Sequence, residues 1–360
     1  MSVPASAELE RRLAHYHQIG FGDVLEALAY LRDDGDYVLA GGSLAYGLGN
    51  HLSDLDVVIA GDATIDASRV PLEHFVGSLR VDVWKFEQRR IDALFASAEE
   101  GLASPAPFGT TFGDVDHEND LKLLHRMAFG VVLDGAPPPR SSPRGHDEIA
   151  CDLVVREYAE RMRTSAFLAQ SALQAGRTLA ALINARQAAE EALQAAIAAR
   201  GLPFTGDKWL QLRLTQDAPD LGAAYESVAR LPGPDGPETP GFVERAVALC
   251  RTLLGVDVSA PAVASGAAWT ADDLTVAEVG ARRLLLARRH AALWELDGDE
   301  AAELAGLVGT NGGPRVWACE DLDPAQAARC FALYERGLIG LRWDRGLPLS
   351  ELRLAGSSGS

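Results

Sequence analysis

A stretch rich in Pro, Ser and Gly at residues 135–145 divides the chain into two parts with different sequence patterns. Before it, short apolar runs alternate with amphipathic segments. After it, alanine and leucine recur at helical spacing over long stretches. Strands mixed with helices, followed by long helices, are typical of an α+β protein, and 360 residues are enough for two or three folded units.

We therefore expect three units along the chain. Residues 1–138 are predicted to form a small domain around a mixed β-sheet, and residues 146–257 a helical domain. Residues 262–355 are predicted to form a small C-terminal lobe. The last residues, 356–360, are small and polar and are interpreted as a linker or tag.

Periodicity places the expected elements. Apolar runs predict strands at 37–40, 55–60 and 81–86, and helical spacing predicts one helix or two over 7–31. Longer helices are expected at 147–175, 177–200 and 241–254. In the C-terminal lobe we expect a helix from Thr270, a strand Ala292–Leu296, two further helices of which the second is Pro324–Arg336, and a hairpin Leu338–Leu354. This order is the outline of a winged helix.

Charge and cysteine usage exclude several classes of protein. The chain has 33 basic and 51 acidic residues, a formal net charge of −18, which disfavours a general nucleic-acid coat protein. Four cysteines lie far apart without a Cys-x-x-Cys pair, which argues against a zinc finger or a disulfide scaffold. The N-terminus lacks a signal-peptide pattern, and no run of about 18 apolar residues occurs. We expect a cytoplasmic protein without a membrane partner.

The segment 39–59 carries the clearest chemical signal. An apolar strand leads into Gly41, Gly42 and Ser43, and Asp54 and Asp56 follow at the start of the next apolar run. Residues at i and i+2 of a strand point to the same face, so the two carboxylates are expected to converge. Adjacent carboxylates repel each other unless a cation neutralises them, and Mg²⁺ prefers such oxygen ligands.

Asp82, between Val81 and Val83, offers a third carboxylate on another apolar strand. Three acids on two strands can hold two Mg²⁺ ions, which activate a hydroxyl and stabilise a leaving oxygen. A glycine turn alone, or an Asp-x-Asp pair alone, is usually an ordinary surface feature. The combination is more specific, because burying carboxylates among valines without a use for them costs several kcal/mol.

This combination resembles the signature of the DNA polymerase β-like nucleotidyltransferase superfamily. The domain plan is similar to that of the stand-alone antibiotic, aminoglycoside-type nucleotidyltransferases. The resemblance implies that the turn Gly41-Gly42-Ser43 holds a triphosphate and that Asp54, Asp56 and Asp82 are catalytic and bind two Mg²⁺ ions. It also implies transfer of a nucleoside monophosphate, with ATP as the expected donor, and release of pyrophosphate.

Two further residues are predicted to bind nucleotide. Ser53 directly precedes the first catalytic aspartate, and Lys208 lies at a turn into a helix, from which it would neutralise triphosphate charge across a cleft. The alternative for Lys208 is a surface lysine packed over Trp209. Lys122, His125 and Arg126 are interpreted as a solvated helix face. Candidates for the general base are Asp82, Glu157, Glu190 and Glu191.

The acceptor is left open by the sequence. The acidic balance favours a cationic small molecule such as an amino-sugar. Other hypotheses are a protein or peptide acceptor, synthesis of an oligonucleotide or cyclic-nucleotide signal, and a regulatory protein that senses nucleotide without turnover. The intact set of three aspartates speaks against a sensor. Tailing of RNA is disfavoured by the negative charge, and the C-terminal lobe lacks the basic cluster that a DNA-reading winged helix carries.

Overall fold

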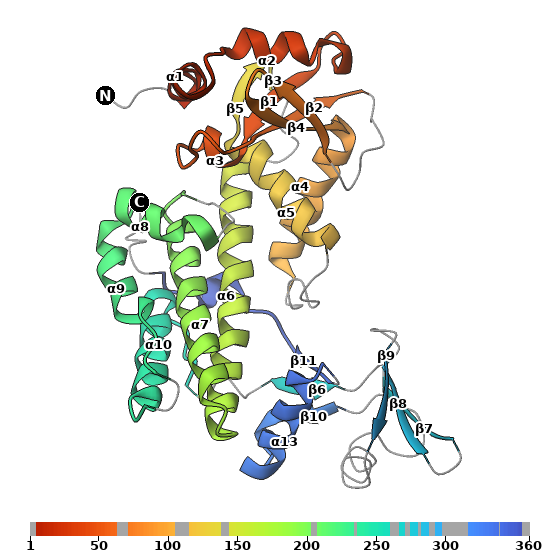
Figure 1. Ribbon diagram of the computed structural model, residues 1–360, viewed down its shortest axis with the longest axis vertical. Helices are drawn as coiled ribbons and strands as arrows, with labels where there is room; N and C mark the ends of the chain where they lie inside the picture. The colour runs from red at the N-terminus through yellow and green to blue at the C-terminus, as the bar shows by residue number, and fades with distance from the viewer. Residues whose placement is uncertain are drawn as a thin grey trace.

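The computed structural model describes residues 5–62, 71–104, 115–137, 144–202, 207–233, 236–259, 266–270, 274–279, 282–287, 292–296, 316–337 and 339–354. They form a mixed α/β protein with a five-stranded sheet at one end, helices along the middle and two small sheets at the other end (Figure 1). No helix in these ranges combines the length and the hydropathy that crossing a bilayer requires. The proposed tag at 356–360 lies outside the described residues.

The five-stranded sheet has the order β3-β4-β2-β1-β5. Strands β2 and β4 are parallel, and the other neighbours are antiparallel. The strands are β1 (Tyr37–Gly41), β2 (Leu55–Gly61), β3 (Leu72–Val76), β4 (Leu79–Glu87) and β5 (Val131–Asp134). The three strands predicted from apolar runs are confirmed as β1, β2 and β4. The sequence patterns missed β3 because its residues are half exposed and form no continuous apolar run, and they missed β5 because its three apolar residues follow closely on the preceding helix.

Successive side chains along each strand pack on opposite faces of this sheet. Val57 and Ile59 face one core, which α1 (Ala5–His17) and α2 (Phe21–Ala27) cover, whereas Val58 faces the core shared with the other helices. The two-helix alternative for residues 7–31 is confirmed, with a short 3₁₀ turn at Ala29–Leu31. The second face is covered by α4 (Gln88–Ala103), α5 (Val115–Phe129) and the start of α6 (His146–Gln174).

Helix α6 connects the three parts of the molecule. Its first half contacts α4 and α5, and further along it packs against α7 (Thr178–Ala198), α10 (Thr239–Leu254) and α13. Buried alanines along α7 let it pack closely against α6 (Figure 1). The helices predicted at 147–175, 177–200 and 241–254 are confirmed. The unit also contains a 3₁₀ turn, Asp207–Trp209, and the helices α8 (Leu210–Gln216) and α9 (Pro219–Ala229).

The C-terminal part contains more strands than the sequence predicted. Two three-stranded sheets have the orders β10-β6-β11 and β7-β8-β9. Their strands are β6 (Ala267–Thr270), β7 (Leu274–Val279), β8 (Arg282–Ala287), β9 (Ala292–Leu296), β10 (Val316–Ala318) and β11 (Gly340–Trp343), with 3₁₀ turns at Cys319–Asp321 and Leu349–Glu351. The predicted strand at 292–296 is confirmed as β9, and the helix from Pro324 as α13 (Pro324–Glu335).

Two predictions for this lobe are wrong. The helix expected from Thr270 is replaced by the end of β6 and by the antiparallel strands β7 and β8. Aspartates after a threonine suggested a helix start, but the apolar and β-branched residues that follow favour paired strands. The terminal hairpin is also absent from the described residues of 338–354, because β11 pairs with β6 instead of with the residues after it. The described elements do not establish a winged helix.

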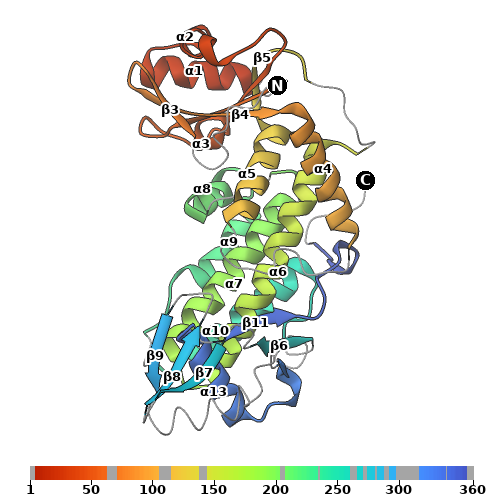
Figure 2. The same ribbon diagram turned by 90° about the vertical axis from the view of Figure 1, so that its right-hand side faces the viewer.

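The lobe is fixed to the middle of α6 by side-chain contacts. The Trp343 indole N–H donates to Thr164 Oγ1 at 3.0 Å, and Arg163 Nη2 donates to the carbonyl of Arg345 at 2.8 Å. The Arg163 guanidinium also stacks 3.9 Å from the centre of the Trp343 ring. The C-terminal lobe therefore packs on α6, well along the helix from the five-stranded sheet (Figure 2).

Candidate active site

A glycine turn is held directly against a carboxylate at the end of β1. The antiparallel register of β1 and β2 places Gly41 opposite Asp56. The chain then turns through Gly42, with a φ of +78°, into the short helix α3 (Gly42–Ala45). A Cβ atom on Gly42 would lie 2.1 Å from Asp56 Oδ2. Only glycine allows both this backbone conformation and this close approach.

The loop from the turn to β2 is closed by short hydrogen bonds. The Ser43 carbonyl accepts from the backbone N–H groups of Leu48 and Gly49, at 2.9 and 2.8 Å. Ser53 Oγ accepts from the backbone N–H of Asn50 at 3.0 Å. Ser43 is buried within the turn, whereas Ser53 closes the loop that precedes Asp54.

The three aspartates gather at one edge of the sheet. Asp56 on β2 and Asp82 on β4 are register partners on parallel strands, and Asp54 lies two residues before Asp56. Arg80 connects the outer two, because its Nη2 lies 2.5 Å from Asp54 Oδ2 and 3.0 Å from Asp82 Oδ2. Register pairing thus brings together the carboxylates that the sequence placed on separate strands.

Arg126, near the end of α5, reaches the same edge of the sheet. Its Nη2 donates to Asp56 Oδ1 at 3.0 Å, and its guanidinium lies 4.3 Å from the centre of the Trp84 ring. The neighbouring His125 is buried edge-on against Tyr46, with ring centres 5.3 Å apart. The prediction of a solvated face is therefore wrong for these two residues. The apolar residues on both sides of them in α5 were the signal for a packed helix.

Burial and mutual repulsion shape the electrostatics of the site. Burial raises the pKa of Asp56 above its ordinary value, and Arg126 partly opposes this. Burial also raises the pKa of Asp82, with Arg80 opposing and Asp54 reinforcing the shift. Asp82 Oδ1 is buried without a hydrogen-bond partner in the described part of the chain. A buried oxygen of this kind is costly unless a ligand completes it.

The positions of the three aspartates and Arg80 determine whether the site suits the Mg²⁺ that the sequence implies. In the ranges that the structure describes, no three Asp, Glu, His or Cys side chains already converge as a metal site, since Arg80 lies between Asp54 and Asp82. The donor chemistry nevertheless suits Mg²⁺, because all the acids are carboxylates and one oxygen of Asp82 has no partner there. The acids therefore fit a divalent cation that takes the place of Arg80.

The helical unit also carries a cation near the turn that the sequence analysis did not single out. Lys208 is exposed, with its ammonium 5.3 Å from the centre of the adjacent Trp209 ring. Arg213 on α8 lies close enough to Tyr46 to lower the pKa of that phenol, although burial dominates and raises it overall. Both views show α8 on the side of α3 that faces the helical unit (Figure 1, Figure 2). Sequence reasoning missed Arg213, which lies within a run of alternating leucines.

The three helical glutamates have partners within the bundle. Glu157 pairs with Arg161 at 2.7 Å, and Glu190 pairs with Arg186 at 2.8 Å. Glu191 accepts from Ser165 Oγ at 2.7 Å, a contact that links α7 to α6. These contacts make each glutamate part of the helix packing.

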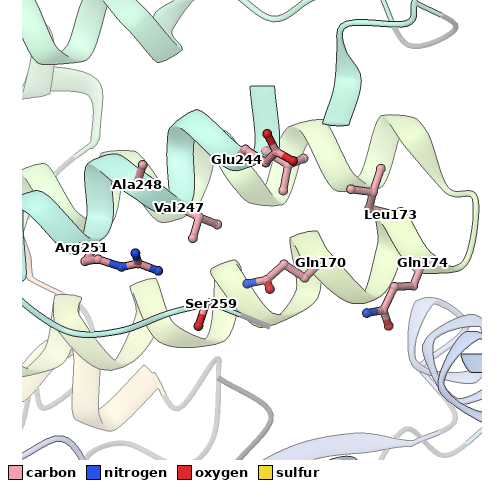
Figure 3. Close-up of a pocket in the computed structure, with 9 residues that line it drawn as sticks. Gln170, Leu173, Gln174, Glu244, Val247, Ala248, Arg251 and Ser259 are labelled. Carbon is pink, nitrogen blue, oxygen red and sulfur yellow. The ribbon is translucent and has the colours of Figure 1, made fainter. Parts of the chain in front are cut away.

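A separate groove of about 400 Å³ lies between α6 and α10 (Figure 3). Its lining is mainly apolar, with Gln170 and Gln174 of α6 and Arg251 of α10 at its edges. Gln170 lies roughly 36 Å along α6 from His146, at a rise of 1.5 Å per residue. The groove includes none of the aspartates.

Comparison with known proteins gives a likeness to a solved structure but no sequence match. No protein-family model and no curated protein sequence matches this chain. A crystal structure of a nucleotidyltransferase-like protein from Exiguobacterium sibiricum is 12% identical, and the match covers 68% of this chain and 73% of that one, with a TM-score of 0.26. At this TM-score the likeness establishes neither fold nor function, and what the site does is inferred from its own geometry.

Proposed function

We propose that this protein is a Mg²⁺-dependent nucleotidyltransferase. It transfers a nucleoside monophosphate from a nucleoside triphosphate, with ATP as the expected donor, to a hydroxyl group of a small molecule. The observation that carries the proposal is the Gly41-Gly42-Ser43 turn lying against Asp56, with Asp82 beside it in register. A phosphate-sized ligand on the turn would be next to carboxylates that need a cation.

The glycine turn and the aspartates have separate roles in this proposal. Backbone N–H groups of the turn and the Ser43 hydroxyl bind phosphate oxygens. Asp54 and Asp56 hold Mg²⁺ on the nucleotide side, and Asp82 completes the metal site on the acceptor side. Bound Mg²⁺ neutralises phosphate charge and lowers the pKa of the acceptor hydroxyl.

The group transfer is a substitution at the α-phosphorus. The acceptor oxygen forms a bond to this phosphorus while the bond to the bridging oxygen breaks. Pyrophosphate leaves with the electron pair of the broken bond, and the hydroxyl proton passes to the Asp82 carboxylate. Without a bound cation, Asp82 lies at hydrogen-bond distance from Arg80, and a cation that takes the place of Arg80 would release the carboxylate from this contact.

A cationic acceptor such as an amino-sugar suits this chain best. The net charge of −18 favours positively charged molecules, and the acids of the site add to it locally. A peptide or protein acceptor is the alternative that the same site would serve. The reaction needs no nucleic acid or membrane, and a cytoplasmic location would supply the nucleoside triphosphate.

Pyrophosphate release tests the proposal. Each of the four nucleoside triphosphates would be incubated with Mg²⁺ and the protein, without and then with a pool of amino-sugars. Acceptor-dependent release that the double variant Asp54→Ala/Asp56→Ala loses would support the proposal. Asp134→Asn is the matched control. Asp134 lies on β5 of the same sheet, outside the site, and pairs with Arg32. No release and no thermal stabilisation with any nucleotide would overturn it.

Nucleotide binding without release would point to the other acceptor class. In that case the melting temperature would rise with Mg²⁺ and nucleotide in the wild type and not in the double variant. A radiolabelled nucleotide would then be offered with cell extract, and label in the protein fraction would indicate a macromolecular acceptor.

A further inference from the structure

Arg126 is held on three sides at the point where the turn meets the carboxylates. Its Nη2 donates to Asp56 Oδ1, and the face of Trp84 lies under the guanidinium. Its side-chain stem passes Gly41 so closely that a Cβ atom there would lie 2.8 Å from Arg126 Cγ. Gly41 thus leaves room for an arginine as well as for the turn.

The two arginines of the site differ in their exposure to solvent and in how tightly their surroundings fix them. The Arg80 side chain is 45% exposed and bridges two carboxylates from the open side. The Arg126 side chain is 17% exposed and stacks on the indole. A cation that occupies the carboxylates would displace Arg80 toward solvent, whereas Arg126 would remain beside Gly41 and Gly42.

We propose that Arg126 is a phosphate-binding residue of the nucleotide site. This inference rests on the proposed function. Without nucleotide, Arg126 neutralises Asp56; with nucleotide bound, it donates to non-bridging oxygens of the terminal phosphates. A planar guanidinium has five N–H donors, so it can keep a contact with Asp56 and bind a phosphate as well.

The alternative role of Arg126 is that of a counter-ion of Asp56 alone, and the two roles differ in a measurable way. A phosphate-binding arginine distinguishes nucleotides by their number of phosphates. A residue that is only a counter-ion changes the affinities for the mono-, di- and triphosphate equally. Its removal increases the affinity for Mg²⁺ in the absence of nucleotide.

The test is the dissociation constant of ATP, ADP and AMP, each measured with Mg²⁺ by titration calorimetry. Arg126→Gln is expected to weaken ATP binding about ten- to a hundred-fold, the range of a charged hydrogen bond, and to change AMP binding little. Arg126→Lys keeps the charge and should recover part of the loss. Arg251→Gln is the matched control, because it removes an arginine from a 2.9 Å pair with Asp257 beside the separate groove.

Equal weakening of all three nucleotides, or no weakening, would overturn the role of Arg126 while leaving the proposed function intact. Absence of nucleotide binding by the wild type would overturn both, and the two failures are therefore distinguishable. Circular dichroism of each variant shows whether it is folded. If Arg126→Gln fails to fold, Arg126→Lys provides the test through the ratio of its dissociation constants for ATP and AMP. A ratio equal to that of the wild type contradicts the proposal.

Discussion

Arginine–carboxylate pairs occur in two regions of this molecule, and their surroundings differ. At the sheet edge, Arg126 pairs with Asp56 beside two further aspartates and a glycine turn. Where α4 meets α6, Arg156 pairs with Glu160 at 3.2 Å and is 1% exposed. Its Nη1 also donates to the carbonyl of Gly101 at 2.6 Å. The second pair is buried and hydrogen-bonded to backbone at the end of another helix.

The difference lies in how completely the buried charges of each region are compensated. Around Arg156, a charge removed from water is compensated by a carboxylate and by main-chain oxygens. At the sheet edge, burial leaves Asp56 and Asp82 with raised pKa values, and Asp82 Oδ1 lacks a partner in the described residues. Acids held in this way are destabilising until a ligand arrives, which is typical of functional sites.

Removing a carboxylate at the sheet edge should have the largest effect on activity. Asp56→Asn is expected to lower nucleotidyl transfer by about a thousand-fold or more, because the amide loses the charge that holds Mg²⁺. The rate of pyrophosphate release measures this. Folding should be retained, since an amide keeps the shape of the side chain and can still accept from Arg126. Activity within ten-fold of the wild type would remove Asp56 from the chemistry.

Removing the arginine between α4 and α6 should chiefly affect stability. Arg156→Ala leaves Glu160 buried and without its arginine, so the free energy of unfolding should fall by about 3–5 kcal/mol. Urea denaturation measures the loss. Activity per folded molecule should stay near that of the wild type, because Arg156 lies at the junction of α4 and α6, where it pairs with Glu160 and the Gly101 carbonyl. A large loss of activity without a loss of stability would break the distinction between the two regions.

The glycine turn allows a sharper comparison between two positions of similar backbone. Gly42→Ala forces a Cβ to within 2.1 Å of Asp56 Oδ2 at a φ of +78°, whereas Gly176, with a φ of +69°, has open space around it. We expect Gly42→Ala to reduce activity about a hundred-fold and Gly176→Ala to leave it unchanged. Both should lose about 1 kcal/mol of stability from the backbone conformation.

The two alanine variants separate backbone strain from contact with the carboxylate. Pyrophosphate release and urea midpoints would be measured side by side. Equal activity in both variants would mean that the approach of Gly42 to Asp56 has no role in the chemistry.

The sequence predicted the strands and acids of the site because these depend on local pattern. Continuous apolar runs specify β1, β2 and β4, and two-residue spacing places Asp54 and Asp56 on one face. It did not predict the arginines, because a guanidinium on α5 reaches Asp56 only through packing between segments 70 residues apart. The apolar residues around Arg126 indicate a packed helix, but nothing in the local pattern identifies Asp56 as its partner.

The C-terminal lobe was predicted less well for a related physical reason. Strand β11 pairs with β6, about 70 residues earlier, and such pairing depends on contacts distant in sequence. Aspartates after Thr270 suggested a helix N-terminus, and a short local signal of that kind was overridden by strand pairing in β7 and β8. Helix α13 was predicted because its own residues specify it, with Asp323 and Gln326 forming a capping box and Pro324 as the first residue of the helix.

The smallest expected effect is a pH-dependent stability difference at Asp82. Burial raises the pKa of this carboxyl in the folded protein, so its charged form costs stability at neutral pH. Without Mg²⁺, Asp82→Asn should therefore melt slightly above the wild type at pH 7. The difference should shrink as the pH falls through the raised pKa of Asp82, because the wild-type carboxyl then becomes neutral as well.

Mg²⁺ should reverse this order at pH 7, since it binds more tightly to the protein that keeps all three carboxylates. Melting curves of both proteins from pH 4 to pH 8, with and without Mg²⁺, measure both effects. If Asp82→Asn melted below the wild type throughout, the ion pair with Arg80 would outweigh the burial of the charge. The sheet edge would then be stabilised in the way that Arg156 stabilises the helix junction, and the contrast between the two regions would not hold for Asp82.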